Sequence, residues 1–161
     1  TRKLSDLTGN NEILEIMSIL GLDPSKENKP TYEKIIIATD EDPDGHHIAS
    51  LIINFFYKWF PYLLREGRIY KLATPLIACK YKGKKQYFYS FDEFEKYSKD
   101  KTITDLTYLK GLGSLSPEDW DNVMKNKKLL NIVIDNKTKN YIDIAFGDSS
   151  KKRRQWMEGK V

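Results

Sequence analysis

Apolar side chains recur with a helical period in two segments of the chain. The clearer segment spans residues 48–60, where large apolar residues keep the 3.6-residue spacing of a helix that packs along one face. They are Ile48, Leu51, Ile52, Phe55, Phe56, Trp59 and Phe60. A shorter stripe predicts a helix over residues 11–20, which Asn10 or Asn11 can cap and Gly21 can end. We expect the longer stripe to lie in the core.

A run of β-branched residues separates these two predicted helices. Residues 34–39 (Lys-Ile-Ile-Ile-Ala-Thr) predict a strand that is buried on both faces of a parallel sheet. The strand leads into an acidic stretch, residues 40–45, and then into the helix. In α/β proteins the functional sites lie at the carboxyl ends of such strands, so this stretch is the first place to look for one.

The rest of the chain alternates strands and short helices. Strands over residues 68–81 and 86–89 are joined by a basic turn, and further strands are predicted over 107–109 and 129–134. Helices are predicted over 90–97, from 116 onward, and over 141–146 and 151–158. The predicted fold is therefore α/β, with a parallel sheet core, a β-hairpin and a helical tail.

Composition narrows the class of protein. The chain has 161 residues, a hydrophobic fraction of 40% that argues against disorder, and a single cysteine, Cys79, which excludes an internal disulfide framework. No apolar run approaches the roughly 20 residues of a membrane span. We expect a soluble intracellular protein. The formal net charge of +4 permits nucleic acid as a partner but does not require it.

The acidic stretch offers the sharpest chemistry. Asp40, Asp42 and Asp44 alternate along it and Gly45 follows, so four acids with Glu41 repel one another unless a cation neutralises them. A solvated acidic turn is one interpretation. A calcium loop of the EF-hand type is excluded, because its twelfth position would be Leu51 and a strand precedes it. The third interpretation, a magnesium site for phosphoryl transfer, suits a strand–loop–helix unit.

Four motifs together resemble one known family. They are residues 39–48 (Thr-Asp-Glu-Asp-Pro-Asp-Gly-His-His-Ile), 73–77 (Ala-Thr-Pro-Leu-Ile), 108–114 (Tyr-Leu-Lys-Gly-Leu-Gly-Ser), and 146–147 with 153–158. In this order and at this spacing the chain resembles the Toprim-containing, gyrase B-like large subunit of type IIA DNA topoisomerases. It looks most like the large subunit of a T4-type bacteriophage enzyme. The resemblance implies a Toprim fold, which is Rossmann-like.

The resemblance also implies residue roles. Asp40 and Asp42 match the family's catalytic carboxylates that bind one or two Mg²⁺ ions, and Asp44 matches the aspartate that supports them. His47 matches a histidine near the DNA backbone, whereas His46 falls on a variable position. Lys110 and Gly111, in the Lys-Gly-Leu-Gly segment, match a place where a phosphate can be contacted.

Two basic patches add candidate contacts to DNA. Lys80, Lys82, Lys84 and Lys85 follow the predicted hairpin, and Lys151, Lys152, Arg153 and Arg154 lie near the end of the chain. A run of charge often marks only a solvated surface. In a DNA enzyme we expect these cations, Arg153 and Arg154 among them, to contact phosphates and to make binding fall with salt.

Three parts of the family pattern are missing. The Glu-Gly-Asp-Ser-type motif, whose glutamate is a further metal ligand, has no match, so we expect the chain to be the later part of a longer subunit. Residues 1–80 would form the later part of the Toprim core, and residues 81–161 would continue the same domain. No nucleophilic tyrosine and no nucleotide-binding motif are identifiable. The resemblance therefore assigns the tyrosine to a partner breakage-reunion subunit and ATP to another part of the full subunit.

The resemblance implies an ATP-dependent enzyme that cleaves and religates double-stranded DNA. The expected assembly is a hetero-oligomer with two copies of each subunit, away from membranes, located on DNA in the cytoplasm of a cell or of a phage host. Two alternatives stay open. One is a Toprim-type primase or nuclease, and the other is a non-catalytic module that binds DNA or docks subunits.

Overall fold

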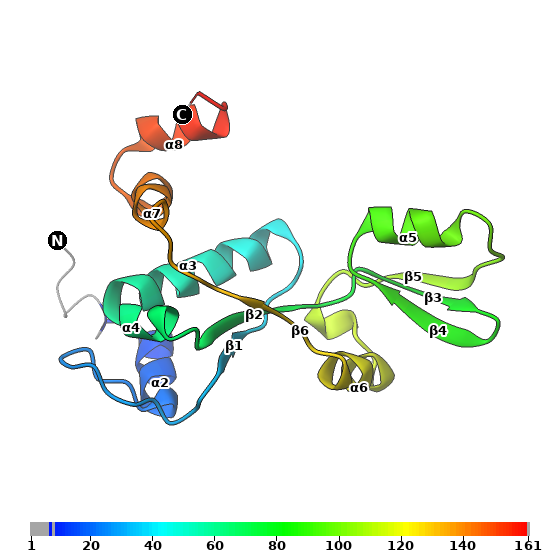
Figure 1. Cartoon of the computed structure of the whole chain (residues 1–161), viewed down its shortest axis with the longest axis horizontal. Coiled ribbons are helices and arrows are strands. Elements are labelled where there is room, and N and C mark those ends of the chain that lie inside the picture. The colour runs from blue at the N-terminus through cyan, green and yellow to red at the C-terminus, as the bar shows by residue number, and fades with distance from the viewer. Residues whose placement is uncertain (1–6, 8, 161) are drawn as a thin grey trace. The chain divides into compact units, whose positions relative to one another are not determined.

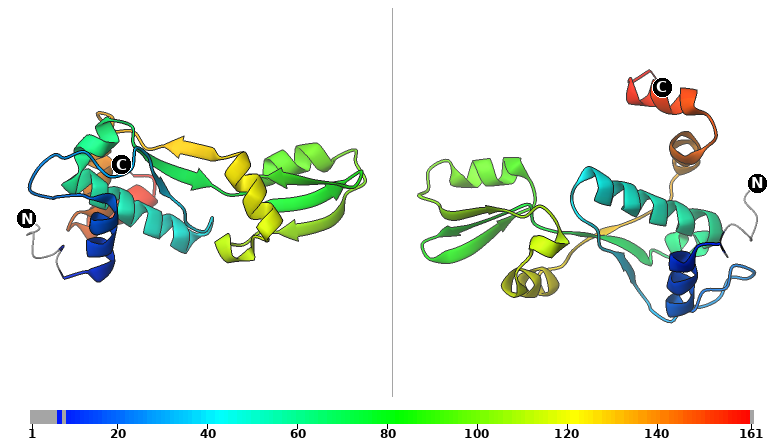
Figure 2. Two further views of the ribbon diagram at one scale, coloured as in Figure 1. Left: turned by 90° about the horizontal axis from the view of Figure 1, so that it is seen from below. Right: turned by 180° about the vertical axis from the view of Figure 1, so that it is seen from behind.

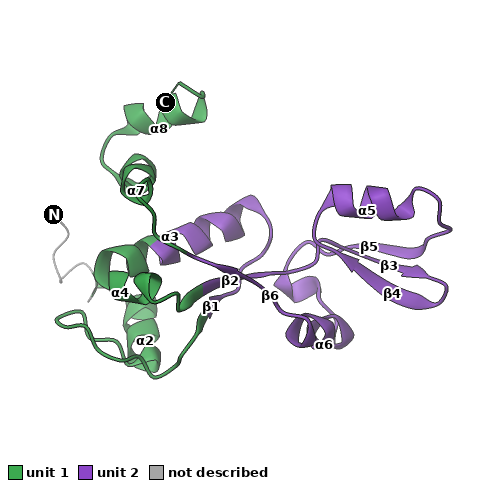
Figure 3. Ribbon diagram, in the orientation of Figure 1, with its two compact units in different colours: residues 1–35, 54–69, 133–161 green, residues 36–53, 70–132 purple. Residues whose placement is uncertain are grey.

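A computed structural model describes residues 7 and 9–160 of the chain, and Figure 1 shows its elements in chain order. The chain divides into two compact units, which Figure 3 distinguishes by colour. Unit 1 comprises residues 1–35, 54–69 and 133–161, and unit 2 comprises residues 36–53 and 70–132.

Helices α2 (Asn11–Leu20), α4 (Pro61–Arg65), α7 (Thr138–Phe146) and α8 (Ser150–Met157) belong to unit 1. The sequence predicted the ends of α2 correctly, because the Asn10 side chain accepts a hydrogen bond from the Ile13 amide and Gly21 closes the helix in a left-handed conformation. The two tail helices are also confirmed, with Gly147 between them.

The long helix α3 (Pro43–Trp59) contains the predicted apolar stripe as far as Trp59 and begins five residues before Ile48, whereas Phe60 caps α4. Phe55, Phe56 and Phe60 are buried, as expected. Ile48 and Leu51 are not, with 50% and 46% of their surface exposed, so the prediction that the whole stripe is core was wrong for its first turns. Pro61 does not only end α3, since it occupies the first turn of α4.

The first sheet has the order β1-β2-β6, with β1 (Ile35–Ile37), β2 (Ile69–Ala73) and β6 (Lys128–Asn131). Strand β1 is shorter than predicted, and its middle residue Ile36 is exposed, so it is not buried on both faces. Strands β2 and β6 pair antiparallel, from Tyr70 opposite Asn131 to Ala73 opposite Lys128. The sheet is consequently not parallel throughout.

The second sheet lies wholly in unit 2 and has the order β4-β3-β5, with both pairs antiparallel. Its strands are β3 (Ile77–Tyr81), β4 (Lys84–Phe88) and β5 (Thr104–Tyr108). The predicted long strand 68–81 is thus two strands, separated by residues 74–76. The hairpin turn is tighter than predicted, because Lys82 and Gly83 both take positive φ and Lys84 and Lys85 already belong to β4.

A helix covers each face of this second sheet. Because side chains alternate along a strand, Ile77 and Cys79 pack with Phe94 of α5 (Phe91–Ser98), and Ala78 packs on the other side with Leu109 and Leu115. Trp120 of α6 (Pro117–Lys125) covers this second cluster. Figure 2 shows α5 alongside the three strands in two further views. The predicted α/β class, the hairpin and the helical tail are confirmed.

Among the described residues, no helix is both long and apolar enough to cross a membrane.

Candidate metal and nucleic-acid site

The acidic stretch turns directly into helix α3. The Asp42 carboxylate accepts a hydrogen bond from the Gly45 amide at 2.7 Å, so Asp42 caps a helix that begins at Pro43. Gly45 is required by close packing, because a Cβ atom there would lie 2.1 Å from the carbonyl oxygen of Asp40. Asp44 is exposed in the first helical turn, where a negative charge is favourable.

Asp40 reaches across unit 2 to a segment 72 residues away. Its Oδ1 accepts a hydrogen bond from the backbone amide of Leu112 at 2.7 Å. A Cβ atom on Gly111 would lie 2.8 Å from the Asp40 Cγ and Oδ2 atoms, so the carboxylate rests against a backbone that only glycine leaves open. The structure therefore brings together a predicted metal ligand and the predicted phosphate-contacting segment, residues 110–113.

Glu41 has a different environment from its two neighbours. Its Oε1 lies 2.5 Å from the Nζ atom of Lys71, and only 17% and 13% of these two side chains is exposed. Its Oε2 lies 3.7 Å from Nε2 of His46. Glu41 is therefore held by an ion pair to β2, and Lys71 supplies part of the positive charge that four adjacent acids require. The sequence pattern did not indicate Lys71, because a contact between residues 30 positions apart is not visible in the spacing.

The predicted phosphate-contacting residues have different surroundings. The side chains of Lys110 and His47 are exposed, and neither side chain has a hydrogen bond or ion pair with another described residue. Both are therefore available to a ligand. Lys110 adjoins the Gly111 and Leu112 backbone against which the Asp40 carboxylate rests, so the predicted phosphate contact and a predicted metal ligand are neighbours in unit 2.

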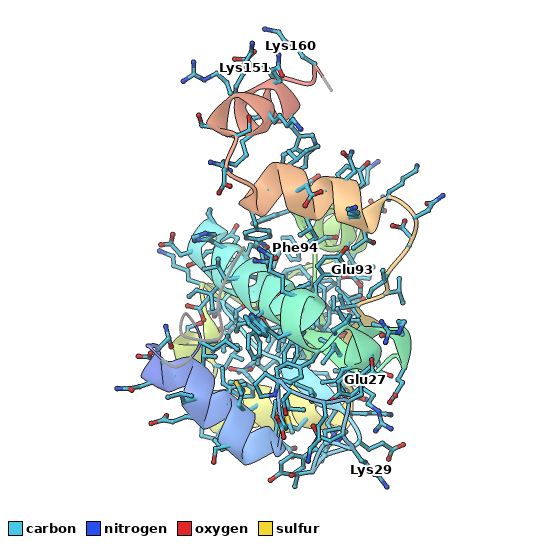
Figure 4. The ribbon with its side chains drawn as sticks, turned by 90° about the vertical axis from the view of Figure 1, so that its left-hand side faces the viewer. Glu27, Lys29, Glu93, Phe94, Lys151 and Lys160 are labelled. Atoms are coloured by element: carbon cyan, nitrogen blue, oxygen red, sulfur yellow. The ribbon has the colours of Figure 1, made fainter. Side chains whose placement is uncertain are left out.

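The basic residues at the end of the chain belong to unit 1. The Arg153 guanidinium donates a hydrogen bond to the carbonyl of Gly147, the residue that ends α7, so this arginine has a structural partner. Arg154 is exposed. Figure 4 shows Lys151 and Lys160 extending from the α8 end of the chain. These residues offer positive charge, and their contact with DNA stays a prediction from the sequence.

The donor set around Asp40 suits a magnesium ion in part. Within residues 7 and 9–160, no three His, Cys, Asp or Glu side chains gather closely enough to hold a metal ion. Asp40 and Asp42 each have one carboxylate oxygen without a hydrogen bond from a described residue. Mg²⁺ is commonly bound by one or two carboxylates, with water and phosphate oxygens completing its shell. Asp40 and Asp42 therefore offer the type of donor that such an ion takes, while water and phosphate oxygens would have to supply the rest of its shell.

Comparisons with known proteins give the chain's relatives. Residues 4–74 match the model of the Toprim domain, and residues 72–161 match that of the C-terminal associated domain of TOPRIM. The chain is 32% identical to the B subunit of DNA topoisomerase 4 from Mycoplasma pneumoniae over 136 residues, 81% of this chain and 21% of that protein. It is 32% identical to the B subunit of DNA gyrase from Thermotoga maritima over 166 residues, 96% of this chain and 26% of that protein.

A solved structure agrees with these matches. The crystal structure of the Plasmodium falciparum topoisomerase II DNA-binding, cleavage and re-ligation domain superposes with a TM-score of 0.82 at 27% identity. The superposition covers 99% of this chain and 24% of that one. The chain thus spans between about a fifth and about a quarter of the length of these relatives.

Proposed function

Since the chain belongs to the Toprim family, in the form found in B-type subunits of type II DNA topoisomerases, we propose that it supplies the magnesium-binding part of such an enzyme. The whole enzyme cleaves and religates double-stranded DNA. The observation that supports this proposal most is the contact between Asp40 and the backbone of Gly111 and Leu112. This contact places the Asp40 carboxylate, which has one oxygen without a hydrogen bond, beside the segment that carries Lys110.

Each residue of this site has a part that follows from its surroundings. Asp40 and Asp42 offer one unpaired carboxylate oxygen each, and their other oxygens are fixed by backbone amides. Each amide limits the freedom of the carboxylate that it bonds. A magnesium ion bound there would stabilise negative charge on a DNA oxygen and orient the scissile phosphate. Lys110, with no intramolecular partner among the described residues, is free to neutralise a neighbouring phosphate.

The remaining parts of the proposal follow from the resemblance. The nucleophilic tyrosine comes from a partner breakage-reunion subunit, two copies of each subunit assemble, and ATP binds elsewhere in the full subunit. The enzyme works on DNA in the cytoplasm. Four further points stay predictions. They are the likeness to a T4-type bacteriophage enzyme, a second metal ion with Asp44 among its ligands, DNA contacts by His47, Arg153 and Arg154, and the division of the chain at residue 80.

DNA cleavage by the complete enzyme tests the proposal. Asp40→Asn and Asp42→Asn are each expected to lower magnesium-dependent cleavage at least about 100-fold, because removal of a metal ligand forfeits several kcal/mol of charge stabilisation. Asp121→Asn, an exposed aspartate on α6, is the matched control and is expected to leave cleavage unchanged. If cleavage persisted in both loop variants, the metal assignment would be wrong.

A second candidate function is a DNA-binding module without metal. The specific observation in its favour is that the described residues bring no three metal-ligating side chains together. Titration calorimetry of the 161-residue chain with MgCl₂ separates the two candidates. Magnesium-dependent heat that Asp40→Asn removes supports the metal site, whereas DNA binding without any such heat supports the module.

A further inference from the structure

Asp119 is a buried carboxylate in unit 2, away from the acidic loop, and only 3% of its surface is exposed. It stands at the third position of α6 and forms a capping box with Ser116, whose amide and hydroxyl both donate to Oδ2, at 2.9 and 2.6 Å. A capping box alone needs no partners from elsewhere in the chain. Asp119 has two.

The two further partners come from strand β4. The Tyr87 hydroxyl donates to Oδ1 of Asp119 at 2.8 Å, and the Nζ atom of Lys85 lies 2.5 Å from the same oxygen. Burial by itself raises the pKa of Asp119, but the hydrogen bonds from Lys85, Ser116 and Tyr87 outweigh it and hold that pKa well below its usual range. Both carboxylate oxygens are thus fully used, and Asp119 ties the start of α6 to the sheet.

The segment that contacts Asp40 is held at both of its ends. At one end Leu109 is buried and its amide donates to the carbonyl of Leu76 at 2.8 Å. At the other end Leu115 is buried beside Ala78, immediately before the capping box of Ser116 and Asp119. Between these anchors Leu112 packs against the same cluster as the Tyr87 ring. The segment that carries the Leu112 amide therefore runs between the buried Leu109 and the start of α6.

We propose that Asp119, held by Tyr87 and Lys85, is a positioning residue that sets the Leu112 amide against Asp40. It acts through the backbone of residues 112–116 and touches neither DNA nor metal. The proposal rests on the proposed function in one respect, since the orientation of Asp40 matters because Asp40 binds metal. The dependence of the Leu112 amide on Asp119 does not require any metal.

The test compares two substitutions of the same kind in one region of the 161-residue chain. Tyr87→Phe removes the hydroxyl that bonds Asp119 and keeps the ring in its cluster. Tyr89→Phe is the control, because the ring of Tyr89 lies under Lys128 and its hydroxyl bonds no described residue. Asp119→Asn is the stronger variant. Tyr87→Phe keeps the proposal testable if Asp119→Asn fails to fold.

Two readouts are measured for each variant, namely amide hydrogen exchange by NMR and the dissociation constant of Mn²⁺ as a probe for magnesium. Tyr87→Phe is expected to speed exchange of the Leu112 amide about fivefold, the effect of one lost hydrogen bond, with the Leu109 amide unchanged. Mn²⁺ binding is expected to weaken by a similar factor. Tyr89→Phe is expected to change neither quantity.

Other outcomes overturn the proposal. Equal acceleration at Leu112 and Leu109 would mean that Asp119 contributes only to general stability, and no change at Leu112 would mean that it does not reach the site. Faster exchange of the Leu112 amide alone, with unchanged Mn²⁺ affinity, would show that the position of this amide does not affect metal binding at Asp40. If the unmodified chain bound no Mn²⁺ while Leu112 responded selectively, the positioning would stand and the proposed function would fail.

Discussion

Asp40 and Asp119 are the same residue type in the same unit, and their surroundings differ in almost every respect. Asp119 is buried and has partners on both oxygens, from a hydroxyl, a phenol, an ammonium group and an amide. Asp40 is half-buried, and one backbone amide is the only hydrogen-bond partner of its carboxylate among the described residues. Both carboxylate oxygens of Asp119 therefore have partners, whereas one oxygen of Asp40 has none among the described residues.

This difference separates a carboxylate with a structural role, Asp119, from one that is proposed to bind a ligand, Asp40. Removal of a fully bonded buried carboxylate destabilises the fold, because its partners are left buried without a counterpart. A carboxylate that is oriented but not saturated can bind a cation at little cost in rearrangement. Glu41, which pairs with Lys71, lies on the structural side of this division although it stands between the two proposed ligands.

The largest effect that sharpens this contrast is on stability. Asp119→Ala is expected to lower the free energy of unfolding by about 3 kcal/mol, since Tyr87 and Lys85 lose their shared acceptor. Asp40→Ala is expected to change it by less than about 1 kcal/mol. Urea denaturation followed by circular dichroism measures both quantities.

The matched control for Asp119 is Asp121, which stands on the same helix in an exposed pair with Lys125. Asp121→Ala is expected to change the free energy of unfolding by less than about 0.5 kcal/mol. Equal losses for Asp119→Ala and Asp40→Ala would remove the distinction between the two carboxylates.

The contribution of Asp119 to the free energy of unfolding is expected to depend on pH. Folding lowers the pKa of Asp119, so as the pH falls the carboxyl group takes up a proton in the unfolded chain before it does so in the folded one. The stability that Asp119 contributes above about pH 4 is therefore lost progressively at lower pH. Asp119→Asn lacks this contribution. The gap in unfolding free energy between the unmodified chain and Asp119→Asn is therefore expected to narrow below about pH 4. A gap that stayed constant down to about pH 2 would contradict the assignment.

The next prediction concerns Gly111, whose backbone lies against the Asp40 carboxylate, and the expected effect is on metal affinity. In Gly111→Ala the new Cβ would displace the Asp40 carboxylate, and the Mn²⁺ dissociation constant is expected to rise about tenfold, as for loss of a supporting contact around a metal ligand. Gly113→Ala is the control, because no described atom lies within 4 Å of a Cβ built there. Equal affinities in the two variants would show that Asp40 does not depend on this contact.

The smallest expected effect concerns DNA. Lys110→Ala is expected to reduce by about one unit the slope of log affinity for duplex DNA against log salt concentration, the effect of one lost phosphate contact. Fluorescence anisotropy at several KCl concentrations measures this slope. Lys96→Ala, an exposed lysine on α5, is the control. An unchanged slope in Lys110→Ala would remove that residue from the DNA contacts.

Local patterns of the sequence were enough to predict several of these features. The caps of α2 and α6, the acidic stretch before α3, and the hairpin all depend on residues close together in the chain. Asp42 was predicted only as a metal ligand, and its capping bond to Gly45 was not predicted although it spans just three residues. For Ile48 and Leu51 the predicted helix was correct but the predicted burial was wrong. Burial depends on which other segments pack against that side of the helix, and the local sequence does not show this.

The features that the sequence did not predict are contacts between distant segments. Leu112 donates to Asp40 across 72 residues, Lys71 pairs with Glu41 across 30, and Tyr87 donates to Asp119 across 32. The start of a helix at residue 116 was predicted, but nothing in the local sequence indicates that Asp119 has two partners on β4. Such contacts depend on how the strands and helices pack, so spacing along the chain does not reveal them.

The most direct measurement of the central claim is a Mn²⁺ titration of the 161-residue chain followed by NMR. Paramagnetic Mn²⁺ is expected to broaden the amide signals of residues 40–45 and of Gly111 and Leu112 before any others, and excess Mg²⁺ is expected to restore them. Asp40→Asn is expected to abolish this selective broadening, and Asp121→Asn to retain it. Broadening that was strongest elsewhere, or that persisted in Asp40→Asn, would contradict the assignment of a metal site at Asp40.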